Sequence, residues 1–159
     1  VRVGDRWGYI DDKGVAVIQP RFQSAGDFQE GLAAVRLEGR LGYIDKRGTM
    51  LIQPRFHVAG DFSAGLAVVA DRFGERFYFI DRHGKRAFDA AFDAAGDFSD
   101  GLARVYQGDR WGYIGPTGEV VIEPVFRDAH DFRGGLGLVT TGDTWGYIDR
   151  TGTFIWKSR

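Results

Sequence analysis

The chain has 159 residues, of which 43% are hydrophobic and 27% charged, with a formal net charge of −1. This balance is typical of one soluble globular domain and excludes a disordered chain. Lys and Arg are spread along the whole length, so there is no basic stripe that would bind nucleic acid. No apolar run is long enough for a membrane-spanning helix, and the lack of Cys excludes disulfides and thiolate metal sites.

The first predicted elements are two strands joined by a tight turn. Residues 7–10 form a strand that follows the turn Gly4-Asp5. The spacing of Asp11 and Gly14 predicts a type I turn, in which the Asp side chain accepts a local hydrogen bond and the Gly adopts a positive φ. The next strand, residues 15–19, should end at the following proline, because Pro cannot donate a ladder hydrogen bond.

A crossing segment and a third strand complete the unit. Residues 21–30 cross to the strand at residues 31–35, and Phe22 and Phe28 should hold this segment against the core. We expect Ala33 and Val35 to face the core and the opposite face of the strand to lie partly in solvent.

The same unit recurs along the whole chain. The segment that starts with Trp7-Gly8-Tyr9-Ile10 starts again at residues 41, 77, 111 and 145, with spacings of 34, 36, 34 and 34. A three-stranded meander of this size cannot bury its apolar face alone, so neighbouring units should stack. The clearest copies of the signature are Trp7, Gly8, Tyr9, Gly14, Trp111, Gly112, Tyr113, Gly118, Trp145, Gly146, Tyr147 and Gly152.

These motifs resemble the WG-repeat family, and the resemblance covers essentially the whole chain. It is carried by the aromatic-Gly-Tyr-Ile-Asp, Pro-x-Phe, Asp-Phe and Gly-Leu-Ala elements in that order. The resemblance implies a mainly bacterial β-repeat array that is often attached to other domains and has no activity common to the family. Several positions depart from the pattern and argue against an identical site in every repeat: Leu41, Phe77, Tyr78, Ala90 and Gly115.

The predicted architecture is all-β: a single open, solenoid-like array of three-stranded meanders over residues 1–159. Its units are approximately 1–34, 35–68, 69–104 and 105–138, with a partial C-terminal cap at 139–159. A closed five-bladed propeller is the alternative, but 34 residues is short for the usual four-stranded blade.

Repeated carboxylates are the first candidates for chemistry, because paired carboxylates catalyse glycoside hydrolysis. However, one set lies at turns that favour Asp, and an Asx-type cap is sufficient to explain the other set. The first set is Asp11, Asp45, Asp81 and Asp149; the second is Asp27, Asp61, Asp97 and Asp131.

The sequence contains no recognisable metal, phosphate or nucleophile motif. His57, His83 and His130 occupy three different repeat positions without zinc-ligand spacing, so we expect no metal and no cofactor. The Trp and Tyr columns share one strand face, where they either form core between units or stack sugar rings. Core is favoured, because Leu41 can fill a core but cannot stack a sugar.

A column of arginines precedes the aromatic position and is the weak candidate for binding carboxylates or phosphates. The competing interpretation is a solvated face paired with acids such as Asp5 or Asp109. The column consists of Arg6, Arg40, Arg76 and Arg110.

The sequence favours a non-catalytic repeat scaffold that binds another protein, or another domain of a longer chain. A carbohydrate or cell-envelope binding module is the first alternative, and a glycosidase that uses the repeated Asp residues is the second. We expect a soluble bacterial protein, cytoplasmic or periplasmic, with no nucleic-acid partner and no membrane span.

Overall fold

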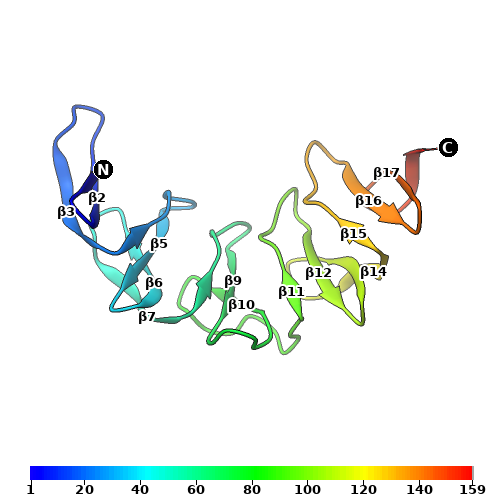
Figure 1. Ribbon diagram of the computed structural model, residues 1–159, viewed down its shortest axis with the longest axis horizontal. Coiled ribbons are helices and arrows are strands. Elements are labelled where there is room, and N and C mark those ends of the chain that lie inside the picture. The colour runs from blue at the N-terminus through cyan, green and yellow to red at the C-terminus, as the bar shows by residue number, and fades with distance from the viewer. Residues whose placement is uncertain (159) are drawn as a thin grey trace.

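The computed structural model describes residues 1–158, which form short β-strands joined by turns. Within that range, no helix is long and apolar enough to cross a membrane. The strands form five small antiparallel sheets that follow one another along an arc, with the two termini at opposite ends (Figure 1). The predicted open array is therefore confirmed, and the sheets do not close into a five-bladed propeller.

We number the sheets 1 to 5 in chain order. Sheet 1 contains β1 (Arg2–Val3), β2 (Arg6–Ile10) and β3 (Ala16–Phe22). Sheet 2 contains β4 (Ser24–Ala25), β5 (Leu32–Leu37), β6 (Arg40–Asp45) and β7 (Met50–Phe56). Sheet 3 contains β8 (Val58–Ala59), β9 (Leu66–Ala70) and β10 (Tyr78–Asp81). Sheet 4 contains β11 (Ala94–Ala95), β12 (Ala103–Gln107), β13 (Arg110–Ile114) and β14 (Val120–Phe126). Sheet 5 contains β15 (Asp128–Ala129), β16 (Gly137–Thr141), β17 (Thr144–Ile148) and β18 (Phe154–Lys157).

Sheets 2, 4 and 5 have a fourth strand beside the predicted three-stranded meander, and this additional strand was not predicted. The additional strand lies within the predicted crossing segment: in β4, Ala25 pairs with Val35 of β5. The chain can turn back so soon because Glu30 and Gly31, with φ of 50° and 82°, form a two-residue turn between β4 and β5. Each of sheets 2 to 5 thus joins the end of one sequence unit to the start of the next.

Strand β3, which follows the turn of Asp11, continues beyond Pro20, so the prediction that Pro20 ends this strand is wrong. Tyr9 pairs with Ile18 and Trp7 pairs with Phe22, which leaves three residues of β3 opposite Gly8. Pro20 lies in this bulge, where its missing N–H removes no ladder hydrogen bond.

The bulge explains why glycine follows the aromatic residue. A Cβ built on Gly112 would lie 2.6 Å from the carbonyl oxygen of Ile122 and 2.7 Å from the nitrogen of Pro124. Gly8 and Gly42 face the same backbone atoms of their own sheets, and the backbone of Trp156 approaches Gly146 in the same way. The glycine is therefore required by the close approach of the partner strand's backbone.

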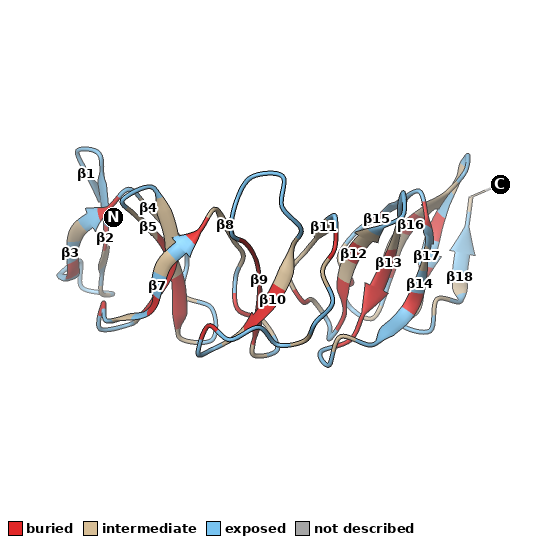
Figure 2. Cartoon of the chain, turned by 90° about the horizontal axis from the view of Figure 1, so that it is seen from below, coloured by how far each residue is buried: buried red, intermediate tan, exposed pale blue. Residues whose placement is uncertain are grey.

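The hydrophobic core consists of four clusters, each lying between two adjacent sheets. Ala33 and Val35 are buried as predicted, and they face sheet 1. The opposite face of sheet 2 is not in solvent, because its Leu32, with 2% exposed area, packs against sheet 3. Both faces of the interior sheets are thus covered, as expected when single units are too small to bury a core alone. Figure 2 shows the buried residues concentrated in the interior sheets.

Candidate functional site

The first set of repeated aspartates forms turns, as predicted. The Oδ1 of Asp45 accepts hydrogen bonds from the backbone N–H of Arg47 at 2.9 Å and of Thr49 at 2.8 Å. These hydrogen bonds lower the pKa of Asp45 below its ordinary value. Asp11, Asp81 and Asp149 accept the equivalent bonds, so these carboxylates are engaged in their own turns.

Three aspartates of the second set, Asp61, Asp97 and Asp131, lie between sheets and do not form the predicted Asx-type caps. The carboxylate of Asp97, in sheet 4, lies against Gly60 of sheet 3, where a Cβ would collide with Oδ1. The carboxylate of Asp131 lies against Gly96 in the same way, 3.2 Å from the position of a Cβ. The glycine of each Gly-Asp-Phe motif therefore makes room for the aspartate of the next sheet.

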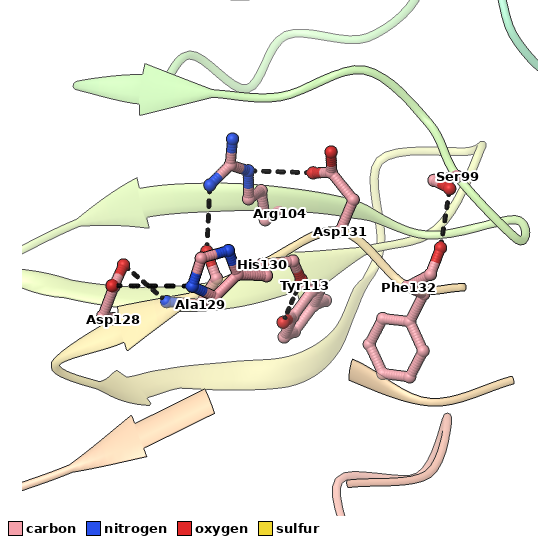
Figure 3. Close-up of polar contacts among 8 residues, drawn as sticks. All are labelled: Ser99, Arg104, Tyr113, Asp128, Ala129, His130, Asp131 and Phe132. Carbon is pink, nitrogen blue, oxygen red and sulfur yellow. Dashed lines mark hydrogen bonds and ion pairs between the residues drawn. The ribbon is translucent and has the colours of Figure 1, made fainter. Parts of the chain in front are cut away.

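A polar network joins sheets 4 and 5 around Arg104 (Figure 3). The guanidinium donates a hydrogen bond to the carbonyl oxygen of Ala129 at 2.9 Å, and its Nε lies 2.9 Å from Oδ1 of Asp131 as an ion pair. Nearby, the hydroxyl of Tyr113 donates to the carbonyl oxygen of His130 at 2.7 Å. Tyr9 and Tyr43 make the same bond to Gly26 and Gly60, so each of these tyrosines fixes the loop of the next sheet.

Asp97 has no equivalent of this ion pair, and its Oδ1 is buried without a hydrogen-bond partner among the described residues. Burial is the largest cause that raises the pKa of Asp97 to about 6, and the charges of Asp61 and Asp131 raise it further. The backbone N–H of Asp61 and the guanidinium of Arg104 act in the opposite direction. Among the carboxyl groups in the described part of the chain, this one has the most strongly raised pKa.

The same loops line a groove of about 530 Å³ that crosses sheets 2 to 5. Acidic side chains outnumber basic ones in its lining, where Arg133 is the basic residue. The rim is built from repeat-equivalent positions, since Gln29, Ser63 and Ser99 come from the same place in successive loops. The other lining residues are Glu30, Asp61, Phe62, Asp97, Phe98 and Asp131. We call this surface the loop groove.

The arginine column is divided among separate local contacts. Arg6 lies 3.6 Å from Asp5, and Arg76 lies 3.3 Å from Asp93 as an ion pair. Arg40 contacts Nδ1 of His57 at 2.8 Å and donates to the carbonyl oxygen of Asp71. Arg110 donates to the carbonyl oxygen of Asp109. The candidate residues thus remain at the surface, each beside a partner from its own or an adjacent sheet.

The Trp and Tyr columns are divided between core and surface. The Tyr position is fully buried at Tyr43, Phe79 and Tyr113, and the ring of Tyr43 packs edge-on against Phe62 of the next sheet at 4.8 Å. Rings at the ends of the array are exposed: Trp7 by 36%, Trp145 by 45%, Tyr147 by 39% and Trp156 by 50%. Exposed rings therefore do not run along the length of the array.

The three histidines are not brought together. His57 packs against Phe73, and His130 lies 3.9 Å from Asp128. Within residues 1–158, no three His, Asp or Glu side chains gather as a metal site would need.

Sequence reasoning missed the loop groove and the inter-sheet role of its aspartates. The available signal was the residue before each of these aspartates. It is Gly at 26, 60 and 96, where the next sheet contributes an aspartate, and His at 130.

The comparisons with known proteins agree with this repeat structure. The family model "WG containing repeat" matches residues 7–40, 42–70, 79–111 and 111–145. None of the curated proteins compared with the chain matches it.

Among solved structures, the chain is similar to one titled "KlHsv2 with loop 6CD replaced by a Gly-Ser linker". The TM-score is 0.56 at 14% identity, and the match covers 82% of this chain and 51% of that one, so the chain spans about half the length of that structure. At this identity the likeness concerns the fold alone. The repeated sheets and the four matched segments together show that the chain belongs to the WG-repeat family.

Proposed function

We propose that the chain is a non-catalytic repeat scaffold that binds a segment of another protein along the loop groove. The observation that supports this proposal is a groove built from the same loop of four successive sheets. Repeat arrays offer extended surfaces of this kind, and ligand contacts can then be distributed over several units.

The charge of the groove defines the partner. Glu30, Asp61 and Asp131 line it together with the less acidic Asp97, and Arg133 is the opposing charge. Glu30 lies 3.8 Å from Arg82 and Asp131 lies 2.9 Å from Arg104, so a partner segment with Lys or Arg side chains would pair first with Asp61. Its binding would weaken as salt concentration rises. The Ser and Gln side chains of the rim supply further hydrogen-bonding groups.

Affinity capture with three folded baits tests this proposal. The baits are the wild-type chain, a groove variant with Gln29→Arg and Ser63→Arg, and an arginine-column variant with Arg76→Glu and Arg110→Glu. We expect one protein to be retained by the wild type and the column variant and lost from the groove variant. The purified protein should then bind directly, and 0.5 M salt should weaken its binding (roughly 4 Å Debye length).

Two other outcomes of the capture experiment would overturn the proposal. Loss from the column variant alone would overturn the assignment of the groove and place binding at the arginine column. Capture of no protein by any bait, with retention of a glycan polymer instead, would overturn the scaffold proposal in favour of the carbohydrate alternative.

A glycosidase is the second candidate, because Asp61, Asp97 and Asp131 line one groove and the pKa of Asp97 is raised. The raised pKa has a structural cause, however: Oδ1 of Asp97 is buried against Gly60 and does not face the groove. Asp131 in turn is paired with Arg104. We expect no hydrolysis of bacterial polysaccharides; turnover that is abolished by Asp97→Asn in a folded variant would establish the enzyme instead.

A further inference from the structure

Polar side chains link neighbouring sheets across their junctions. At the junction of sheets 2 and 3, Arg55 donates a hydrogen bond to the carbonyl oxygen of Gly84 at 2.6 Å. Glu30, in the turn between β4 and β5, accepts a hydrogen bond from the N–H of Gly65 at 3.0 Å. Tyr43 adds the hydrogen bond from its hydroxyl to sheet 3. Because hydrogen bonds are directional, such links fix the angle between two sheets as well as their separation.

Two other junctions have links at the same repeat positions. At the junction of sheets 1 and 2, Arg21 donates to the carbonyl oxygen of Gly48 at 2.7 Å. At the junction of sheets 4 and 5, Asp100 accepts a hydrogen bond from the N–H of Gly135 at 2.8 Å. Both junctions also contain the tyrosine bond, and Arg104 adds its contacts to the second. These three junctions are therefore held at a defined angle.

The junction of sheets 3 and 4 lacks the side chains that form these links. Ala91 lies at the position of the linking arginine, Ala64 at that of the turn acid and Phe79 at that of the tyrosine. The ion pair between Arg76 and Asp93 crosses this junction, but its side chains are exposed by 53% and 52%. An exposed pair of this kind contributes little to rigidity.

Two further features weaken this junction. The carboxyl of Asp97 receives the backbone N–H of Asp61, but its Oδ1 is buried without a hydrogen-bond partner among the described residues. A buried oxygen left unpaired destabilises the packed arrangement. The connecting chain between Asp81 and Ala94 is held to sheet 3 by isolated bridges, whereas β7 and β14 lead into the next sheet as paired strands.

The apolar core of this junction is as large as its neighbours. It contains eight buried residues, the same number as the cores on either side, so the two sheets stay together. Apolar contacts are non-directional, and such a core holds two sheets in contact without fixing the angle between them. Cohesion with few directional contacts, next to an irregular connection, is the structure of a hinge.

We propose that the junction of sheets 3 and 4 is a hinge about which sheets 1–3 and sheets 4–5 move as two blocks. The junction lies near the middle of the arc, between β10 and β11 (Figure 1). The loop groove crosses it, because Ser63 belongs to sheet 3 and Ser99 to sheet 4, so bending changes the width of the groove. A segment bound along the groove would hold the blocks in one arrangement, a consequence that rests on the proposed function.

Double electron–electron resonance between paired spin labels tests the hinge in the free protein. The chain has no cysteine, so labels can be placed at chosen exposed turn positions. One pair, Arg47→Cys with Thr117→Cys, spans the junctions of sheets 2–3 and 3–4. The matched pair, Lys13→Cys with His83→Cys, occupies the same repeat positions and spans the junctions of sheets 1–2 and 2–3. We expect a broad or two-peaked distance distribution for the first pair and a single narrow peak for the matched pair.

Substitutions that exchange the links should exchange this behaviour. Ala64→Glu reproduces Glu30, whose φ of 50° is close to the 54° of residue 64, and Ala91→Arg reproduces Arg55. Together they should narrow the distribution of the first label pair. The reverse change, Glu30→Ala with Arg55→Ala, should broaden the distribution of the matched pair. Thermal unfolding checks that each variant is folded.

Two results would overturn the proposal. Equal widths for the two label pairs without further substitution would show that no hinge lies between sheets 3 and 4, and this comparison holds even if a substituted variant fails to fold. Widths that do not respond to either exchange in folded variants would show that the missing links are not its cause. Neither measurement needs a binding partner, so the hinge and the proposed function can fail independently.

Discussion

Sheets 3 and 4 come from equivalent stretches of sequence, but only sheet 4 has a complete set of strands. In sheet 4, Gly112 follows the aromatic residue and β14 closes over it through the proline bulge. In sheet 3 the glycine is replaced by Tyr78 and the proline by Ala90, and the third long strand is reduced to isolated bridges, between Phe77 and Phe92 and between Ile80 and Arg86. The replacement of the glycine and the proline thus accompanies a change in the pairing of a whole strand.

The difference has a steric cause. The closure of β14 brings backbone atoms to within 2.6–2.7 Å of where a Cβ on residue 112 would be, and no side chain fits there. Tyr78 instead donates a hydrogen bond from its hydroxyl to Asp71 at 3.0 Å, and Arg86 lies over its ring. Phe88 still packs on Phe79 at 5.5 Å, so sheet 3 keeps its core contact while it loses the ladder.

The largest expected effect comes from making sheet 4 resemble sheet 3. Gly112→Ala should lower the free energy of unfolding by about 3 kcal/mol or more, since the methyl group forces β14 away from β13. Chemical denaturation measures this change.

Gly108→Ala in the same sheet is the matched control. Gly108 has a φ of 58° but open space around its Cβ position. An alanine there should therefore lower the free energy of unfolding only by the backbone strain, about 1 kcal/mol. Equal losses for the two variants would contradict the steric account of the bulge.

The contact between sheets 3 and 4 provides the second prediction, because it buries Asp97. The folded pKa of about 6 lies above the ordinary 3.8, so the folded state binds the proton more tightly and this group makes the protein less stable as pH rises from about 4 to about 6. Asp97→Asn should remove this pH dependence and raise the stability at pH 8 by up to about 3 kcal/mol.

Asp45→Asn is the control with the opposite sign. Its folded pKa is lowered, so the stability that it contributes is present at neutral pH and is lost as pH falls through the folded pKa. Unfolding curves between pH 3 and 8 would show the two trends; an Asp97→Asn variant with the wild-type pH profile would contradict the burial of this carboxyl.

The smallest predicted effect compares Tyr43 in sheet 2 with Phe79, its equivalent in sheet 3. Tyr43→Phe removes the hydrogen bond from its hydroxyl to the carbonyl oxygen of Gly60 and should cost about 1 kcal/mol. The ring packing on Phe62 is retained. A loss above 3 kcal/mol in thermal or chemical unfolding would show that the hydroxyl has a larger role than fixing one loop.

Much of the fold could be predicted from the sequence, because the repeat spacing, the turn Asp and the turn Gly depend on local chemistry. The two-residue strand β4 could not be, since two residues carry no periodic signal. The bulge around Pro20 was missed because a proline within a strand is ordinarily read as its end.

Less of the candidate site than of the fold could be predicted from the sequence. The aspartates of the loop groove are set by contacts between sheets, such as that of Asp97 with Gly60, which are 37 residues apart in the sequence. The arginine column was visible in the sequence, but its pairing with residues such as Asp93 and His57 depends on how the strands associate.

Hydrogen exchange of the backbone amides tests most directly the claim that the glycine after the aromatic residue allows the third long strand to close on its sheet. Residues 85–92, which follow β10 of sheet 3, are equivalent in sequence to residues 119–126, which contain β14 of sheet 4. The amides of both segments can be followed in one experiment. The account predicts that amides at 85–92 exchange much faster than those at 119–126, and that Gly112→Ala raises the exchange at 119–126 toward the level of sheet 3. Equal protection of the two segments in the wild type would contradict it.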